Sequence, residues 1–478
     1  TMGLLIRNGE IVTAADRYLA DVSCEGGIIT ALGRGLEPRA GDTVIDASGR
    51  LVLPGFVDPH VHLDLPAGEG VASADDFASG TAAAIAGGTT TVIDFVTPAP
   101  GESLLAALDA RLGAAKGAAC DFALHMGITR WHAGTAEEMR ELVEHRGVTS
   151  FKVYLAYKDA LMIDDGELYQ VMEHAARLGA TVMVHAENGD AIAHLQRELV
   201  AAGKTGPEFH PLSRPSSLEG EATHRALVMA RLHGATAYIV HMTCRESVEA
   251  LERAKLAGQR CFGETCPQYL LLDDRVYVKP GFESAAYVLS PPIRPAHVGH
   301  HDALWRGLSN GLLDVVATDH CPFLMRDKER GRDDFSRIPN GGGGVEDRLA
   351  LLHTYGVCEG RFDLQRMVAL GSTHPARIFG LHPRKGTVAV GSDADLVVFD
   401  PAATGTRSAK AHHSRADRNL YEGMRTKGAP THVIVGGEVR FAEGRLAAKP
   451  GSGRFLARSV DPARVPHPVG EKEMGRVV

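Results

Sequence analysis

Eight short apolar segments, spaced along the middle of the chain, constrain its fold more than any other feature. They are rich in β-branched residues, and stretches of helical composition such as 165–179 and 245–258 lie between them. The segments are GFVDPHVHL, TTTVIDFV, DFALHMGI, SFKVYLAY, TVMVHAEN, TAYIVHMT, QRCFGETC and LDVVATDH. Because strands that alternate with helices form parallel sheets, eight such units predict a parallel barrel over residues 53–385. In a barrel of this kind, chemistry gathers at the carboxyl-terminal ends of the strands.

The two ends of the chain differ from this middle section. Residues 1–52 contain short strand-like runs broken by the hairpin-type turn pairs NG and GG, and residues 386–446 repeat that style. We therefore expect both ends to build one small sheet domain. Residues 447–478 are rich in Pro, Gly and Arg, and they predict an extended C-terminal tail.

Composition narrows the classes of function. The formal net charge is -8, the pI is about 6.3, and no run of Lys and Arg occurs, so neither a nucleic-acid-binding nor an anionic-membrane surface is expected. The seven cysteines are odd in number and scattered, with no CxxC pair, which argues against a disulfide framework or a thiolate zinc site. The first residues do not resemble a signal peptide, and no apolar stretch approaches the ~20 residues of a membrane span. We expect a cytoplasmic protein.

Five of the eight predicted strands carry a side chain that could bind a metal ion. His60 and His62 are two residues apart, so both would point to one face of the first strand. A single strand histidine is usually a structural residue, but six candidates on one barrel are unlikely to coincide by chance. Neutral imidazole and carboxylate groups suit zinc or a similar divalent ion. The predicted ligands are His60, His62, Lys152, His185, His241 and Asp319.

Lys152 is unusual because it lies within the apolar strand SFKVYLAY. A lysine is almost never fully buried unless its charge is paired or removed. Near cations and away from water its pKa falls, and the neutral amine can add carbon dioxide to form a carbamate. Such a carbamate would bridge two metal ions as a long carboxylate does. The alternative is an ammonium group that reaches a buried carboxylate or solvent; the neighbouring histidines and Asp319 favour the carbamate.

Several longer motifs resemble those of the dihydropyrimidinase/hydantoinase branch of the amidohydrolase superfamily, in order from about residue 3 to about residue 446. They are GFVDPHVHLDLP, GGTTTVIDF, SFKVYLAYKD, VMVHAENGD, IVHMTC, LSPPIRP, ATDHCPF, IPNGGGGVEDR and RKGTVAVGSDADLVVFDP. The resemblance implies a (β/α)8 barrel, a small β-sandwich built from both termini, and a binuclear zinc centre held by the six residues above. It also implies substrate contacts from Tyr157, Ser290 and Asn340, and assembly as a homotetramer or homodimer.

The expected reaction is zinc-dependent hydrolysis of the cyclic amide bond of 5,6-dihydropyrimidines or 5-monosubstituted hydantoins to N-carbamoyl amino acids, through a metal-bridging hydroxide. Asp319 would carry the water proton to the leaving ring nitrogen, and the Tyr157 hydroxyl would stabilise the oxyanion. Ser290 and Asn340 would hold the –CO–NH–CO– edge. Both also suit simple turns, since Ser290 precedes two prolines and Asn340 precedes four glycines.

Discrimination between substrates is expected from apolar side chains in the loops 63–74, 96–101 and 155–165. These loops offer Leu65, Val71, Val96, Leu155 and Leu161 as apolar contacts, and Leu65 and Leu161 are the predicted substrate-binding residues among them. Because Lys158 is the one basic residue in these loops, a neutral or apolar ring substituent should be preferred over an anionic one.

Three alternatives remain open at this point. An allantoinase would act on a hydantoin that carries a ureido arm. A dihydroorotase is disfavoured because Asp64 stands where that family carries an arginine for the substrate carboxylate. A non-enzymatic scaffold of the same fold is disfavoured because such relatives lose metal ligands, whereas all six are present.

Overall fold

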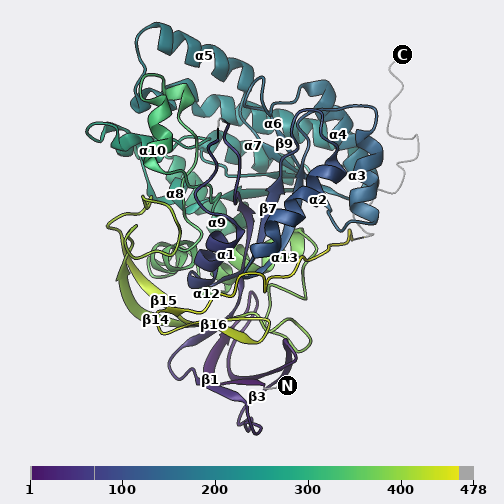
Figure 1. The fold of residues 1–478 in the computed structure, drawn as a ribbon, viewed down its shortest axis with the longest axis vertical. Coiled ribbons are helices and arrows are strands. Elements are labelled where there is room, and N and C mark those ends of the chain that lie inside the picture. Colours follow the sequence, from purple (N-terminus) through teal and green to yellow (C-terminus); the bar gives the residue numbers. More distant parts are fainter. Residues whose placement is uncertain (1–2, 69, 462–478) are drawn as a thin grey trace.

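The computed structural model describes residues 3–68 and 70–461, and its central element is a parallel sheet of eight strands in the order β13-β12-β11-β10-β9-β8-β7-β6 (Figure 1). All eight strands predicted from the sequence are present. Their bounds are β6 Phe56–Val61, β7 Thr89–Val96, β8 Asp121–Gly127, β9 Ser150–Tyr154, β10 Thr181–His185, β11 Thr236–Ile239, β12 Cys261–Thr265 and β13 Val315–Val316.

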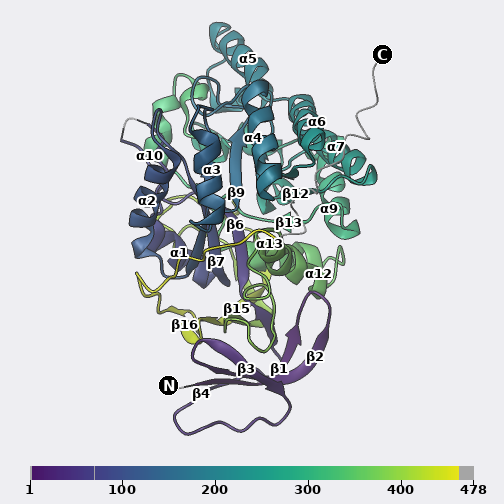
Figure 2. The same cartoon turned by 90° about the vertical axis from the view of Figure 1, so that its right-hand side faces the viewer.

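Helices connect these strands and lie on the outside of the sheet, where α3 and α4 are side by side (Figure 2). The helix α4 illustrates why they form where they do. The Asp164 side chain accepts from the Glu167 amide at its start, and Gly179 ends it in the left-handed region at φ 66°. The helices are α1 Phe77–Ala86, α2 Leu104–Ala114, α3 Thr135–Glu144, α4 Asp165–Leu178, α5 Gly189–Ala201, α6 Ser216–His233, α7 Arg245–Leu256, α8 Pro267–Leu271, α9 His300–Asn310, α10 Met325–Lys328, α11 Arg348–Leu351, α12 Leu364–Val368 and α13 His374–Ile378.

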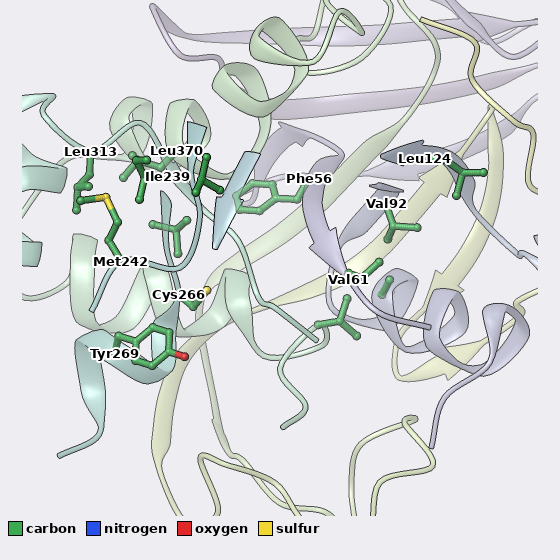
Figure 3. Close-up of a cluster of buried hydrophobic side chains, with 14 of the residues drawn as sticks. Phe56, Val61, Val92, Leu124, Ile239, Met242, Cys266, Tyr269, Leu313 and Leu370 are labelled. Carbon is green, nitrogen blue, oxygen red and sulfur yellow. The ribbon is translucent and has the colours of Figure 1, made fainter. Parts of the chain in front are cut away.

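Strand residues contribute alternately to two apolar cores, as the period of a strand requires. One core packs strands against the helices and includes Phe56, Val92 and Ile239 (Figure 3). The other holds the residues of opposite parity, such as Ile93 and Met183, and includes residues from outside the sheet such as Phe379 and Leu456. The strands are therefore buried on both faces, which explains their nearly continuous apolar sequences.

The first strand of the sheet, β6, meets the segment that follows the last strand, β13, so the sheet curls round on itself. Val61 and His320 form a parallel bridge, and the His62 amide donates to the His320 carbonyl at 2.8 Å. The buried guanidinium of Arg348 donates to the carbonyls of Val57 in β6 and Val316 in β13, both at 3.0 Å. The Val61–His320 bridge places the carboxyl-terminal end of β6 beside the segment that follows β13.

The two ends of the chain share a second, mostly antiparallel sheet, as the sequence predicted (Figure 1). The link between them is the pairing of β5 with β14, in which Val52 lies opposite Val398. This sheet has an apolar core of its own, with Ile6, Val22 and Ile434 among its members. The strands are β1 Leu4–Val12, β2 Arg17–Glu25, β3 Ile28–Gly33, β4 Thr43–Asp46, β5 Leu51–Pro54, β14 Leu396–Thr406, β15 Arg425–Val435, β16 Glu438–Ala442 and β17 Arg445–Leu446.

Part of the predicted tail packs against the parallel sheet. The Phe122 amide donates to the Arg454 carbonyl at 3.0 Å, and the Leu456 amide donates to the Phe122 carbonyl at 2.7 Å. The Leu456 side chain is fully buried. Residues 462–478, the rest of that tail, lie outside the described residues.

Within residues 3–68 and 70–461, no helix combines the length and the apolar character that crossing a membrane requires.

Replacing Arg348 with Met should destabilise the protein strongly. The substitution removes the cation that lies 3.8 Å from the buried carboxylate of Asp58. It also removes the donor for the carbonyl groups of Val57 and Val316. Loss of one partner of a buried charge pair costs about 3–5 kcal/mol. The thermal midpoint should fall by several degrees at a fixed scan rate. Arg140→Met is the control, because Arg140 makes exposed ion pairs on α3, and equal midpoints for the two variants would contradict the assignment.

Candidate metal centre and substrate cavity

A cavity of about 440 Å³ lies where the carboxyl-terminal ends of the parallel strands converge. Eleven of the site residues predicted from the sequence contribute to its wall, although they come from segments far apart in the chain. They are His60, His62, Leu65, Lys152, Tyr157, Leu161, His185, His241, Ser290, Asp319 and Asn340.

Three of the six predicted metal ligands form a compact group. The candidate ligand atoms of His60, His62 and Asp319 lie within 4.8 Å of one another. The Nε2 atoms of both histidines are 3.2 Å from Asp319 Oδ1. The rings of His185 and His241 lie next to this group, with centroids 4.6 Å apart, and the His241 ring is 5.5 Å from that of His60.

Unpaired nitrogen atoms indicate that these residues suit a cation. Among the described residues, His60 Nε2, His62 Nδ1 and His241 Nδ1 are buried without a hydrogen-bond partner. Buried polar atoms are rarely left in this state. Burial lowers the pKa of His62 to about 4 and that of His241 well below its usual value, so both imidazoles are neutral and can act as ligands.

Lys152 is 1% exposed and lies on β9 opposite Met183, with its side chain toward the interior core. Its Nζ atom is 4.9 Å from the centre of the Phe95 ring and 5.2 Å from that of Tyr154. Burial lowers the pKa of Lys152 to about 8, even though the Asp319 and Glu264 charges oppose the shift. A substantial fraction of this lysine is therefore in the neutral form at mildly alkaline pH.

The backbone at three site residues lies in the left-handed region that glycine favours. The φ angles are 64° at Tyr157, 37° at His241 and 51° at Asp319. Each residue follows the end of a strand, where the chain leaves the sheet. Conformations of this kind cost about 1–3 kcal/mol and cluster at functional sites.

The most important residue that the sequence analysis missed is Glu264, at the end of β12. A carboxylate only accepts hydrogen bonds, so His60 donates through Nδ1 to Glu264 Oε1 at 2.6 Å and keeps Nε2 for a metal ion. Glu264 also accepts from the Tyr238 hydroxyl at 2.7 Å and from the His241 amide at 3.0 Å. Burial alone would lower the pKa of His60, but the Glu264 and Asp319 charges raise it to about 9. An acidic residue in the apolar segment QRCFGETC is the signal that could have revealed it.

Glu187 orients His185 in the same way. His185 Nε2 donates to Glu187 Oε2 at 2.7 Å, which leaves Nδ1 as the ligand atom. The Arg214 guanidinium donates to the same carboxylate oxygen at 2.5 Å and lies 5.7 Å from the centre of the Tyr157 ring. The buried charge of Glu187 is thus balanced by an arginine that also contacts the wall of the cavity.

His320, next to Asp319, uses both of its ring nitrogens elsewhere. Nε2 donates to Asp75 Oδ2 at 2.9 Å, and Nδ1 accepts from the Gly344 amide at 3.1 Å. It has no free nitrogen for a metal ion, which agrees with its absence from the predicted ligand set.

The other wall of the cavity carries polar groups suited to an imide. The Asn340 side-chain amide donates to Ser290 Oγ at 3.0 Å, and Tyr157 makes a side-chain hydrogen bond with Ser290. Burial raises the pKa of Tyr157 to about 12, so its hydroxyl keeps its proton at neutral pH.

The apolar part of the wall corrects some of the sequence-based expectations. Leu65 and Leu161 line the cavity, as expected. Val96 and Leu155 instead belong to the core. Val71 packs with Cys321 and Phe323 in a small cluster that Leu65 also contacts. The lining instead includes Leu289, Phe323 and Ile338. Sequence alone could not tell which loop residues face inward.

The expectation about basic residues is corrected as well. Lys158 forms an ion pair with Asp190, and the exposed Arg337, from a loop outside the three considered, contributes to the cavity wall. A guanidinium at an exposed position is screened by solvent, so it biases substrate charge weakly.

Comparison with known proteins agrees with this arrangement. Residues 51–440 match the amidohydrolase family. The chain belongs to the amidohydrolase family. This amidohydrolase is 46% identical to the D-hydantoinase of Geobacillus stearothermophilus over 96% of its own length and 97% of that protein. It is 43% identical to the dihydropyrimidinase of Arabidopsis thaliana over 95% of its own length and 85% of that protein.

The similarity extends to three dimensions. The crystal structure of the dihydropyrimidinase from Brevibacillus agri superposes with a TM-score of 0.94 at 43% sequence identity, and the match covers 96% of this amidohydrolase and 99% of that chain. The resemblance inferred from the sequence motifs is confirmed.

Glu264→Gln should weaken the binding of divalent metal ions by about 10- to 100-fold, because the amide no longer holds His60 and His241 as a carboxylate does. Metal content after dialysis against a graded series of chelator concentrations measures the change. Glu249→Gln is the control, since Glu249 is on the exposed face of α7, with 53% of its side chain accessible. Equal metal retention in both variants would show that Glu264 has no part in the centre.

Proposed function

We propose that this amidohydrolase opens the ring of 5,6-dihydropyrimidines and 5-monosubstituted hydantoins to give N-carbamoyl amino acids. The observation that carries the proposal is one cavity in which a metal-binding group of two histidines and an aspartate faces Tyr157, Ser290 and Asn340. The names of the relatives, D-hydantoinase and dihydropyrimidinase, support the same class of substrate.

Two divalent ions, zinc in the first place, would be held by the four histidines, Asp319 and a carbamate on Lys152. When bound, such ions supply an activated water and polarise a carbonyl group. The unpaired ring nitrogens of His60, His62 and His241 and the lowered pKa of Lys152 support this donor set. Addition of carbon dioxide to the neutral amine forms one N–C bond and releases one proton. The product has the negative charge that a buried site between cations requires.

Asp319 is proposed as the proton carrier. Burial would raise the pKa of its carboxyl group, but the adjacent histidines, His60 first among them, hold it well below its usual range. The carboxylate is therefore ionised at neutral pH and can accept a proton from water. As the C–N bond of the ring breaks and the new C–O bond forms, that proton passes to the departing nitrogen.

Tyr157, Ser290 and Asn340 would position the cyclic imide. The Tyr157 hydroxyl, protonated at neutral pH, can donate to the carbonyl oxygen as negative charge develops on it, a contribution of about 3 kcal/mol for one such donor. Ser290 and Asn340, hydrogen-bonded to each other, present polar groups to the –CO–NH–CO– edge. Leu65 and Leu161 would contact the ring substituent and discriminate by size, where one methylene group is worth about 1–3 kcal/mol.

The predicted division of the chain completes the proposal. Residues 53–385 would be a (β/α)8 metallohydrolase barrel, and residues 1–52 with 386–446 would be a small β-sandwich. The contact between β6 and the segment after β13 supports this division, and so does the separate apolar core of the terminal sheet. Assembly as a homotetramer or homodimer and a cytoplasmic location stay predictions.

Turnover of four substrates tests the function directly. Protein loaded with zinc should open dihydrouracil and a 5-monosubstituted hydantoin faster than allantoin or dihydroorotate, as followed by the N-carbamoyl products. Asp319→Asn should fold normally but lose nearly all turnover, and metal analysis of the same sample separates loss of ions from loss of proton transfer. A metal-loaded protein that opens none of these rings would contradict the proposal.

Carbamylation of Lys152 should depend on pH. Because its pKa is lowered from 10.5 to about 8, the fraction of Lys152 in the reactive neutral amine form increases as the pH rises through 8. After the metal has been stripped, reactivation by zinc should therefore require dissolved carbon dioxide and should be faster at pH 8 than at pH 6.5. Lys152→Arg should stay inactive, because guanidinium cannot lose its proton. Full activity of the arginine variant would rule out the carbamate.

A further inference from the structure

Lys328, the last residue of α10, is buried to 1% exposure, and its ammonium group points at three backbone carbonyl groups. Nζ donates to the carbonyl oxygens of Gly341 at 2.9 Å, Pro339 at 3.0 Å and Val288 at 3.3 Å. An ammonium group has three protons, so each proton has one acceptor. The group is thus fully satisfied by backbone alone.

These three carbonyl groups belong to the two loops that carry the proposed imide contacts. Val288 is two residues before Ser290, while Pro339 and Gly341 flank Asn340. The loops also contact each other directly, through the Gly341 amide, which donates to the Val288 carbonyl at 3.0 Å. Lys328 therefore joins both loops at the point where they present Ser290 and Asn340 to the cavity.

On the side away from Lys328, the loop with Asn340 packs closely against the backbone of Cys321. Gly341 has φ 152°, and a Cβ atom there would lie 2.2 Å from the Cys321 carbonyl oxygen. The next residue, Gly342, accepts from the Cys321 amide at 2.9 Å. The loop is pressed against the segment that follows Asp319, so the position of Asn340 is defined relative to the metal-binding group.

The loop with Ser290 has further supports that do not involve Lys328. His210 Nε2 donates to the Leu289 carbonyl at 2.7 Å, and the Tyr269 hydroxyl donates to the Pro291 carbonyl at 2.9 Å. Among the described residues, the side chain that reaches the carbonyl groups on both sides of Asn340 is Lys328. Loss of its ammonium group should consequently displace Asn340 more than Ser290.

We propose that Lys328 is a positioning residue, whose ammonium group sets the spacing between Ser290 and Asn340 that the –CO–NH–CO– edge of the substrate requires. The inference rests on the proposed function, because it assumes that these two residues bind the imide. Lys328 does not touch the substrate; it acts through the carbonyl groups next to the residues that do.

The test compares Lys328→Met with Arg326→Met. Both residues are on α10, but the Arg326 side chain is 81% exposed. In Lys328→Met the KM for hydantoin and for dihydrouracil should rise about tenfold or more, because one hydrogen bond to the substrate is weakened. The value of kcat should change much less. Metal content should stay at the wild-type value, and Arg326→Met should match the wild type in every measurement.

Two further measurements separate positioning from a general loss of stability. In an Asn340→Ala background, Lys328→Met should raise KM only slightly, because the residue through which it acts is already gone. The ratio of bulky to small 5-substituted hydantoins should change less in Lys328→Met than in Leu161→Ala, since Leu65, Leu161 and Phe323 line the cavity from other segments.

The outcomes are distinct. Wild-type KM in a folded Lys328→Met protein, or full additivity with Asn340→Ala, overturns the proposal. If Lys328→Met fails to fold, Lys328→Gln takes its place, because glutamine keeps two hydrogen-bond donors. Its KM should rise severalfold. A wild-type KM in Lys328→Gln, or failure of both variants to fold, also overturns the proposal. If the wild-type enzyme opens no cyclic amide at all, it is the proposed function that fails.

Discussion

The contact between β6 and the segment after β13 is the constraint on which the rest of the structure depends. His60 and His62 are at one edge of an eight-stranded sheet and Asp319 is at the other, so they can share a metal ion only if the sheet curls until its edges meet. The Val61–His320 bridge and the guanidinium of Arg348 between the strands hold that closure. Thr318 adds a hydroxyl that donates to Asp58 at 2.6 Å.

The two ends of the parallel strands have opposite characters. At the amino-terminal end, apolar side chains such as Phe379 and Leu456 fill the interior, and they contribute to stability. At the carboxyl-terminal end, charged groups such as Lys152 and Glu264 are buried, which is costly unless each has a partner. The pairing of Glu187 with Arg214 and of Glu264 with His60 and Tyr238 meets that cost and also orients the ligands.

Residue patterns were enough to predict the eight strands and a small sheet domain shared by both ends of the chain. They also singled out six candidate ligands on these strands, and all six line one cavity. They did not identify Glu264 or Glu187, because an acidic residue near a strand end is ordinary until its partner is known. They also placed Val71, Val96 and Leu155 at the cavity, whereas these side chains pack in cores. Apolar loop residues look alike in a sequence, and only the path of the loop decides which of them face a cavity.

The sequence by itself determined which elements form and which side chains could bind metal, because strand period, helix capping and ligand chemistry depend on neighbouring residues. Only the tertiary structure decided which distant residues meet. Lys328 contacts the carbonyl groups beside Asn340 and before Ser290 because separate loops converge on one cavity. His60 meets Asp319 because the sheet closes. Contacts of this kind depend on the curvature of the whole sheet, and no local run of residues encodes that curvature.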